Sequence, residues 1–223
     1  MKKLFAFIAV AIGLSSCGLL PSSKTIICNG PVQEVAMEKI KNFTDVTIDG
    51  SASITFKQAD KYNVTVRANQ EVFDYLDYRL SGRNFIIGTE RYVTLVPEVY
   101  DIYVQAPWFS SMVVNGAADI WMTDGYVSST DLAVAVKGTA NIDFIGVSVP
   151  TMDIEVSGAA KIFLTDIFVD KLYITLTGTG SVVVSGSADY ASIAISGTAH
   201  VDAADLTYGH LDKSITGTGT IKL

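Results

Sequence analysis

The protein has 223 residues, of which 49% are apolar and 17% charged, so the chain is long enough for one domain with a sizeable core and too apolar to be disordered. It carries 16 Lys and Arg against 23 Asp and Glu, a formal net charge of −7. This acidic balance argues against nucleic acid or an anionic bilayer as the main partner, because their phosphate groups would repel the protein.

Residues 1–16 predict a secretory signal peptide. Two lysines form a short basic start, and the apolar run 4–14 that follows is too short to span a bilayer as a mature helix. The next segment, 14–17 (LSSC), resembles the lipobox of bacterial lipoproteins. The resemblance implies cleavage before Cys17 and a diacylglycerol anchor on its thiol. An ordinary signal peptide with an incidental cysteine is the alternative.

Residues 17–41 are predicted to hold the lipidated cysteine and a tether, with 18–30 as its flexible part. Cleavage removes two lysines and leaves 14 basic against 23 acidic residues, or −9, which suits a body held away from anionic lipid. Cys28 has only Cys17 as a partner, so we interpret it as a spare thiol rather than half of a disulfide or a metal ligand. The sequence has no other stretch of 18 apolar residues, so acyl chains are the only membrane anchor that it predicts.

Residues 42–107 predict an irregular β subdomain. Apolar residues alternate with polar ones in several short runs, as in strands with one buried face. Asn69 followed by 71–78 predicts one short capped helix. We expect this subdomain to cap one end of the repeats that follow, because unpaired strand edges promote aggregation.

The strongest signal is a repeat of about 20 residues in 108–223. Around a glycine in each copy, residues at even offsets are apolar or small and those at odd offsets are largely polar, which is the period of a strand with one buried face. A seventh copy, 48–54 (IDGSASI), lies upstream and is set apart by an insertion. The six repeat glycines are Gly116, Gly138, Gly158, Gly178, Gly197 and Gly217.

A unit of 20 residues with two or three short strands cannot bury its apolar face alone, so the copies must stack. We therefore predict an all-β fold: a right-handed parallel β-helix (solenoid) with about 20 residues per coil and an irregular N-terminal β cap. Coils spaced by about 4.8 Å would give six coils a rise of about 29 Å. A sandwich or meander of hairpins is the alternative, and it predicts no constant offset between the inward ladders.

The chain resembles the auto-transporter adhesin family with a head GIN domain. The members of this family are secreted and lipoprotein β-helix proteins common in Bacteroidetes. The likeness covers nearly the whole mature chain and rests on 43–46 (FTDV) with the segment 49–60 behind it, on the Ser/Thr-Gly-x-Gly/Ala ladder, and on 214–222 (SITGTGTIK). The resemblance implies a role in the cell envelope. The chain departs from the family where alanine replaces a second glycine, at Ala118, Ala140, Ala160 and Ala199.

Residues that would face outward on the strand after each glycine form a candidate binding face. Aromatic rings stack on sugar faces, and carboxylates and amides bind hydroxyl groups, so this mixture is typical of glycan binding. Coverage of the rings by the N-terminal subdomain or by a partner is the alternative. The candidate residues are Asp119, Trp121, Asn141, Asp143, Lys161 and Phe163.

An enzymatic alternative uses Asp119 and Asp143, which would lie about 8 Å apart on the diagonal. That spacing falls within the roughly 6.5 to 9.5 Å window of inverting glycosidases, although an acidic repeat protein produces such pairs by chance. Two histidines exclude a histidine-rich metal site, and the sequence has no phosphate loop, nucleophile elbow or HExxH motif. We therefore predict no catalytic residue, metal or cofactor.

Together these features predict a non-enzymatic, lipid-anchored envelope protein whose β-helix surface serves adhesion or binds a glycan or another envelope protein. The alternatives are a polysaccharide hydrolase or lyase on the same scaffold, and a structural envelope spacer. The expected location is the outer membrane, at its periplasmic leaflet or at the cell surface. In the lineage that the resemblance suggests, acidic residues after the lipidated cysteine accompany surface export, and 18–24 contain none, which favours the periplasmic leaflet.

Overall fold

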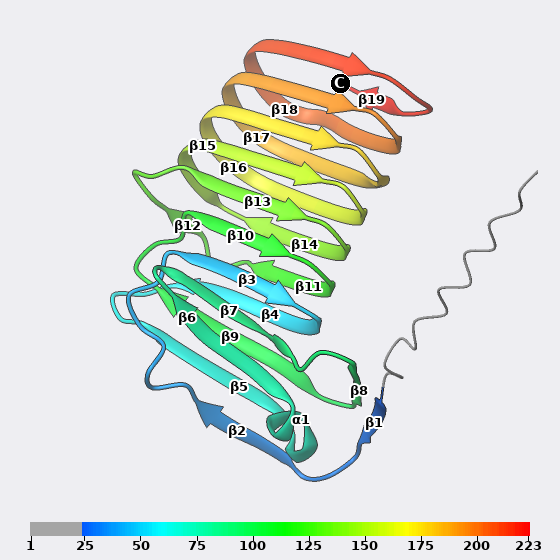
Figure 1. The fold of residues 1–223 in the computed structure, drawn as a ribbon. Helices are drawn as coiled ribbons and strands as arrows, with labels where there is room; N and C mark the ends of the chain where they lie inside the picture. Colours follow the sequence, from blue (N-terminus) through cyan, green and yellow to red (C-terminus); the bar gives the residue numbers. More distant parts are fainter. Residues whose placement is uncertain (1–23) are drawn as a thin grey trace, which may run out of the picture.

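The computed structural model describes residues 24–223, so the predicted signal peptide and the predicted lipidation site at Cys17 lie outside the described residues. The described chain has 19 strands and one short helix, and its parallel coils stack into a β-solenoid of about six turns (Figure 1). Strands about 20 residues apart pair in parallel at a constant offset. The predicted β-helix is confirmed, and the hairpin sandwich is excluded because its neighbouring strands would be antiparallel.

Each coil has one strand before its glycine and one after it, and these form two parallel sheets that enclose the core. A third, narrower run joins β12 (Tyr126–Val127) to the start of β15 (Val147–Val156) and to the middle parts of β16 (Ala159–Leu176), β17 (Thr179–Ile195) and β18 (Thr198–Ile215). The sheet before the glycines contains β7 (Asn84–Thr89), β3 (Asp45–Asp49), β10 (Ser111–Val114), β13 (Leu132–Val136) and the final parts of β15 (Val147–Val156), β16 (Ala159–Leu176), β17 (Thr179–Ile195) and β18 (Thr198–Ile215). The sheet after them contains β9 (Tyr100–Ala106), β4 (Ser51–Gln58), β11 (Ala117–Met122), β14 (Thr139–Ile145), the first parts of β16 to β18, and β19 (Thr220–Lys222).

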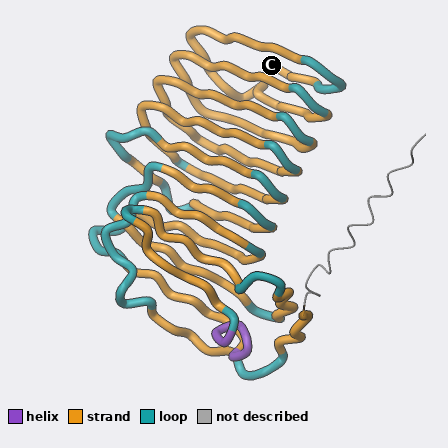
Figure 2. Tube along the Cα trace, viewed as in Figure 1, coloured by secondary structure: helices purple, strands orange, loops and turns teal. Residues whose placement is uncertain are grey.

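The glycine corners stack directly on one another and form the column of loops in Figure 2. The backbone N–H of Thr139 donates to the carbonyl oxygen of Gly116 at 2.8 Å, and the same bond recurs at each coil boundary from the Gly50 corner to the Gly217 corner. A Cβ atom on Gly138 would overlap the carbonyl oxygen of Gly116. The glycines in the middle of the column are therefore required by the close approach of neighbouring coils.

Apolar side chains from the two sheets form continuous inward columns. The alanines that replace the second glycine of the family are compatible with these columns, since they are buried and Ala160 pairs with Gly180. One column runs through the whole stack with exposed fractions of 1% or less: Ile54, Ile120, Ile142, Ile162, Val182 and Val201.

The structure contains one coil that the glycine alignment did not detect. Strands β7 and β9 pair with β3 and β4 on the side away from β10 and β11, and Gly88 forms the corner of this coil. The coil therefore precedes that of Gly50 in space but follows it in the sequence. The excursion 90–99, which contains β8 (Val93–Pro97), separates Gly88 from β9 and hides the repeat.

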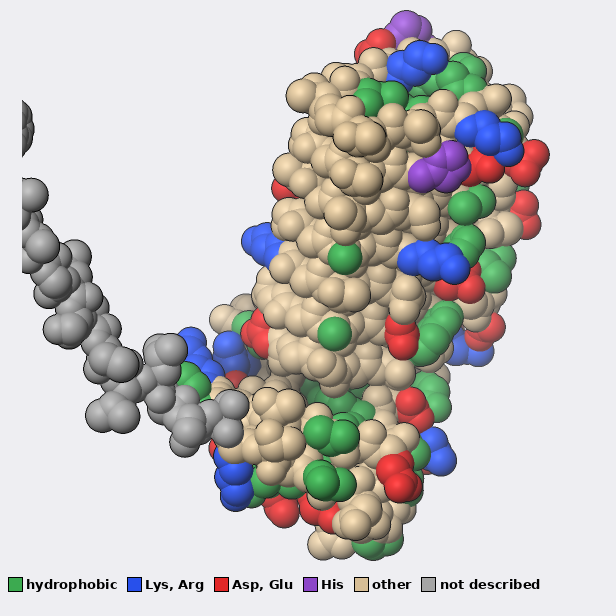
Figure 3. Space-filling model, turned by 90° about the vertical axis from the view of Figure 1, so that its right-hand side faces the viewer, with side chains coloured by type: hydrophobic (Ala, Val, Ile, Leu, Met, Phe, Trp, Pro, Cys, Tyr) green, Lys and Arg blue, Asp and Glu red, His purple; other side chains and the backbone are tan. Residues whose placement is uncertain are grey.

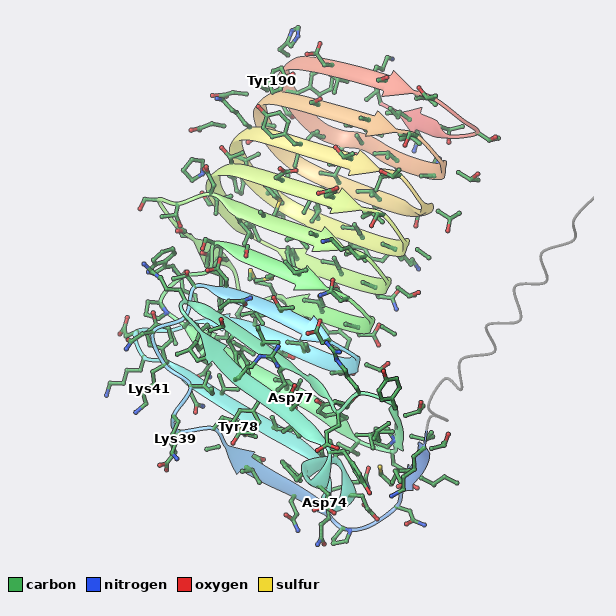
Figure 4. All side chains as sticks on the ribbon, in the orientation of Figure 1. Lys39, Lys41, Asp74, Asp77, Tyr78 and Tyr190 are labelled. Atoms are coloured by element: carbon green, nitrogen blue, oxygen red, sulfur yellow. The ribbon has the colours of Figure 1, made fainter. Side chains whose placement is uncertain are left out.

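Antiparallel strands close this end of the stack as an irregular cap. Strand β6 (Leu76–Ser81) pairs with β7, and β5 (Asn63–Asn69) pairs with both β9 and β2 (Val32–Ala36). Figure 4 shows labelled cap residues, among them Asp77 and Tyr78, at the opposite end of the stack from Tyr190. Among residues 24–223, no helix is long and apolar enough to cross a membrane.

The predicted helix over 71–78 is wrong in its second half and in its cap. Helix α1 (Gln70–Asp74) ends early because the residues from Leu76 onward pair with β7. Asn69 makes no side-chain cap, because its buried amide binds other segments. Its Nδ2 donates to the carbonyl of Gly30 at 2.9 Å, and its Oδ1 accepts from the N–H groups of two residues after β8, at 98 and 99.

From Lys24 onward, the segment expected to be a tether forms strands instead. Strand β1 (Lys24–Cys28) pairs in parallel with β8, and β2 joins the cap. Cys28 is 1% exposed, and burial raises the pKa of its thiol. Cys28 forms no disulfide with the described residues, as the sequence predicted, but its expected place on a flexible tether is wrong. It belongs to the core because Ile26 and Cys28 on one side of β1 have apolar neighbours to pack against.

An aromatic cluster joins the coil that contains β4 to the repeats that follow it. The ring of Phe109 lies 5.1 Å from that of Phe56 and 5.9 Å from that of Tyr126. The Tyr126 hydroxyl is buried, donates to the carbonyl of Phe109 and accepts from its N–H, both at 2.8 Å. The cluster thus couples the coil of β4 to the first repeats by packing, and the segment before β10 to β12 by hydrogen bonds.

Tyr126→Phe is expected to lower the free energy of unfolding by about 2 kcal/mol, because it leaves the N–H and C=O groups of Phe109 buried without partners. Urea denaturation would measure the loss. Tyr208→Phe is the matched control, since Tyr208 is 39% exposed and makes no side-chain hydrogen bond to the described residues. Equal stabilities of the two variants would contradict the coupling role.

Candidate functional site

The six candidate residues lie on neighbouring strands of the sheet after the glycines. Residues two apart on one strand point to the same side, so the six side chains share one outer surface. All six are exposed or half-buried, so neither the cap nor another described segment covers them. They form two rows, with Asp119, Asn141 and Lys161 in the first and Trp121, Asp143 and Phe163 in the second.

Contacts between side chains fix the orientation of this face. Asn141 Nδ2 donates to Asp119 Oδ1 at 2.6 Å, and the Lys161 ammonium lies 5.0 Å from the centroid of the Phe163 ring. No other described side chain binds the second carboxylate oxygen of Asp119 or the amide oxygen of Asn141. The face therefore presents oriented acceptors beside two aromatic rings.

Both rows continue into the C-terminal coils, where their polar groups bind one another. Asp202 pairs with Lys222 at 2.9 Å, and this hydrogen bond lowers the pKa of Asp202 and raises that of Lys222. His200 Nδ1 contacts the hydroxyl of Thr220. Figure 3 shows the sheet in profile along its right-hand side, where charged, histidine and hydrophobic side chains alternate. The acceptors without a partner are thus concentrated at the end near the cap.

A groove of about 470 Å³ lies at that end of the face. Its floor is formed by β4, β11 and β14 just after their glycine corners, and its wall by the segment 97–101 that leads from β8 into β9. Asp119 and Asn141 line it together with Ser51 and Ser53. The volume lies within the range of small-ligand sites.

The groove was not predicted from the sequence, for two different reasons. Aligning 48–54 with the other repeats places Ser53 beside Asp119, as the structure does, so this part of the floor could have been found. The wall could not, because 97–101 is the place where the excursion that breaks the repeat returns to the stack at β9. It brings Glu98 and Asp101 to the groove, and Asp101 forms an ion pair with Arg67 at 3.0 Å.

Tyr100 in the groove wall carries a buried hydroxyl that has no hydrogen-bond partner among the described residues. The residue is 8% exposed, and burial strongly raises the pKa of its phenol. It precedes the pair formed by Asp101 and Ser53, so it takes the inward position that Ala52 has in the next coil.

An aromatic stack on the outer surface of the C-terminal coils was also missed. Its ring centroids lie 5.8 Å apart between Tyr173 and Tyr190 and 5.7 Å apart between Tyr190 and His210. The Tyr190 hydroxyl donates to Asp212 at 2.7 Å, which lowers the pKa of this carboxylate. Tyr190 pairs with Lys171 rather than Tyr173, so the repeat alignment does not reveal the stack. Since Tyr190 and His210 cover each other's faces, the stack stabilises neighbouring coils.

The geometry gives little support to an acid–base pair. Asp119 lines the groove and binds Asn141, whereas Asp143 lies outside the groove, between Trp121 and Phe163. The two carboxylates therefore do not face each other across a cleft, as glycoside hydrolysis requires. Among residues 24–223, no group of three or more His, Cys, Asp or Glu side chains could hold a metal ion. What the arrangement can do is bind a ligand along an exposed face.

Comparisons with known proteins agree with this architecture. The structure is similar to that of a "putative adhesin" from Parabacteroides distasonis, with a TM-score of 0.72 and 19% identity over 89% of this chain and 84% of the other. It is also similar to a "putative adhesin" from Bacteroides fragilis, with a TM-score of 0.71 and 14% identity over 88% and 99%. At these identities the likeness shows a shared fold, and a search of curated proteins finds no match.

The family itself is established by the sequence. Residues 42–223 match the family described as "Putative auto-transporter adhesin, head GIN domain". The match begins where the predicted β subdomain begins and includes every glycine of the corner column. The chain therefore belongs to the auto-transporter adhesin family with a head GIN domain, as the sequence motifs indicated.

Proposed function

We propose that the protein is a non-enzymatic, lipid-anchored envelope adhesin that binds a neutral glycan along the face formed by the two rows and the adjoining groove. One observation carries the proposal: oriented carboxylate and amide acceptors adjoin two aromatic rings on a single sheet. Hydrogen-bonded coils hold these groups in place, so little conformational entropy is lost when a ligand binds. The anchor at Cys17 and the outer-membrane location belong to the same proposal.

The chemistry of the face favours a neutral glycan over an anionic one. Glu98, Asp101 and Asp119 line the groove, and Asp143 lies beside it, so a sulfated or uronic acid polymer would meet repulsion. Hydroxyl groups of a neutral sugar can donate to these carboxylates. Trp121 and Phe163 lie two strand spacings apart, about 10 Å, so an extended chain could contact both rings.

Trp121→Ala is expected to weaken binding of a neutral polysaccharide about tenfold, which corresponds to about 1.4 kcal/mol. The reason is the loss of ring stacking at the centre of the face. Binding would be screened on a glycan array with the chain from residue 18 and measured by calorimetry for each hit. Asn141→Ala should weaken the same hits, because it removes an acceptor and frees the carboxylate of Asp119.

Phe168→Ala is the matched control, since Phe168 is 56% exposed but lies on the third run of strands, away from the face. It should leave binding unchanged. A glycan whose affinity survives Trp121→Ala and Asn141→Ala but falls in Phe168→Ala would place the site elsewhere. Reducing-sugar release that is lost in Asp119→Asn would instead support the enzymatic alternative.

A further inference from the structure

Strands β1 and β8 form a separate two-stranded parallel sheet, here called the β1–β8 ribbon, beside the cap. Its inner side packs against the core through Ile26 and Leu95. Its outer side carries Ile27 opposite Val96, with exposed fractions of 72% and 50%. Tyr92, in the turn that leads into β8, is 59% exposed. The paired outer positions at 25 and 94 are threonines, so the outer side carries no charge.

This surface is unusual for the molecule. Ile27 is the most exposed large hydrophobic side chain in the described part of the chain. It lies on a two-stranded ribbon, an element that has little stability of its own and gains none from exposing apolar area. Figure 3 shows hydrophobic side chains gathered in the lower part of the glycine-corner side, the region where Figure 1 places β1 and β8. Contact with an apolar phase outside the protein would explain why apolar side chains occupy the outer side of the ribbon.

The chain that precedes the ribbon indicates which phase this is. Strand β1 begins at Lys24, seven positions after Cys17, and a fully extended chain of that length spans at most about 25 Å. An acyl anchor on Cys17 therefore keeps the ribbon within that distance of the bilayer surface, at a high local concentration of lipid.

The distribution of charge also favours approach to the membrane by the end of the molecule that carries the ribbon. Residues 24–107 contain nine Lys and Arg against eleven Asp and Glu, a net −2, whereas 108–223 contain five against twelve, a net −7. Because the bacterial envelope carries anionic groups, the repeats are repelled more strongly than the cap. The cap with its ribbon is thus the end that can approach lipid at the lower electrostatic cost.

We propose that the outer side of the β1–β8 ribbon inserts Ile27 and Val96 into the interface of a lipid bilayer, together with Tyr92 from the turn before β8, when the chain is anchored at Cys17. The proposal rests on the lipid anchor of the proposed function and adds a second contact to it. Tyrosine favours the boundary between headgroups and acyl chains, and isoleucine and valine gain from burial there. Two contacts would restrict the tilt of the solenoid and so hold its glycan face in a defined orientation.

The test places a tryptophan probe on the ribbon of the chain from Cys17. Tyr92→Trp would be made in a Trp108→Phe, Trp121→Phe background, with Phe168→Trp in the same background as the matched probe on a distant coil. The thiol of Cys17 would be coupled to a maleimide lipid in phosphatidylcholine vesicles, while Cys28 is protected by burial. Circular dichroism would check the fold of each variant.

On these vesicles the probe at 92 should shift its emission to the blue and be quenched by acyl-brominated lipid several-fold more than the probe at 168. Adding Ile27→Asp and Val96→Asp should abolish the difference. Equal quenching of the two probes would overturn the proposal. A blue shift that grows with protein density, without quenching by brominated lipid, would also overturn it, because it would indicate that a second copy of the protein covers the ribbon. Mass spectrometry of Cys17 from cells tests the anchor separately, because chemical coupling bypasses cellular acylation.

Discussion

Gly138→Ala is expected to lower the free energy of unfolding by about 3 kcal/mol or more, a large loss for a change of one methyl group. The added Cβ would overlap the carbonyl oxygen of Gly116, and backbone cannot rotate away as a side chain does. That carbonyl also accepts the hydrogen bond from Thr139 that joins the two coils. Separating them would break this bond and open the apolar columns on either side.

Gly82→Ala is the control that distinguishes the cost of this steric overlap from the cost of placing alanine in a left-handed backbone conformation. Gly82 has φ +61°, and no atom lies within 4 Å of the position that an added methyl group would take, so its substitution costs only the left-handed backbone penalty of about 1 to 2 kcal/mol. No left-handed φ is found at Gly138. Urea denaturation of both variants would compare the two costs. A Gly138→Ala variant no less stable than Gly82→Ala would show that the coils can separate without penalty.

The repeat made the fold predictable because one physical requirement recurs at a nearly constant interval. Each corner glycine must admit the carbonyl of the neighbouring coil, and the residues around it must alternate between core and solvent. Once Gly116 and Gly138 are aligned, the register follows, and Asp119 is correctly placed beside Asn141. The prediction failed at Gly88, where the requirement is still met but 11 residues, 89–99, separate the glycine from β9, the next strand of the stack.

The features that the repeat does not encode could not be predicted in the same way. The groove wall at 97–101 depends on where an excursion returns to the stack, which sequence spacing does not determine. Strand β1 is only five residues long, and its two adjacent isoleucines obscure the alternation that marks a half-buried strand. Its pairing with β8 is a contact between segments nearly 70 residues apart. A long-range pair of short strands leaves no local pattern.

Lys213→Ile is expected to make the protein self-associate through the C-terminal end of the stack. Lys213 pairs with Ile193 and so continues an inward column whose members are fully buried in the preceding coils. In the described chain, this part of β18 pairs only with β17 in its sheet, so its other edge is open. An inward-pointing charge on an edge strand opposes pairing with another chain, because docking would bury an unpaired ammonium group.

The surroundings of Lys213 would otherwise favour association with another chain, and the charge of its side chain opposes this. Tyr208 and Ile215 on the same strand are 39% and 45% exposed, so the open end offers apolar area as well as unpaired backbone groups. Isoleucine at 213 would extend this area and remove the charge, and two ends could then pair edge to edge. Sedimentation velocity over a range of concentrations would detect the larger species, which should be absent from the parent chain.

Lys171→Ile makes the same change in charge and hydrophobicity on β16, where both neighbouring strands are present. If an open edge is the cause, only the change at 213 should produce association. Association of both variants would indicate general hydrophobic attraction, and association of neither would show that another feature protects the end. A cap of antiparallel strands covers the opposite end of the solenoid. The two ends would then avoid aggregation by different means, one by added strands and the other by a single lysine.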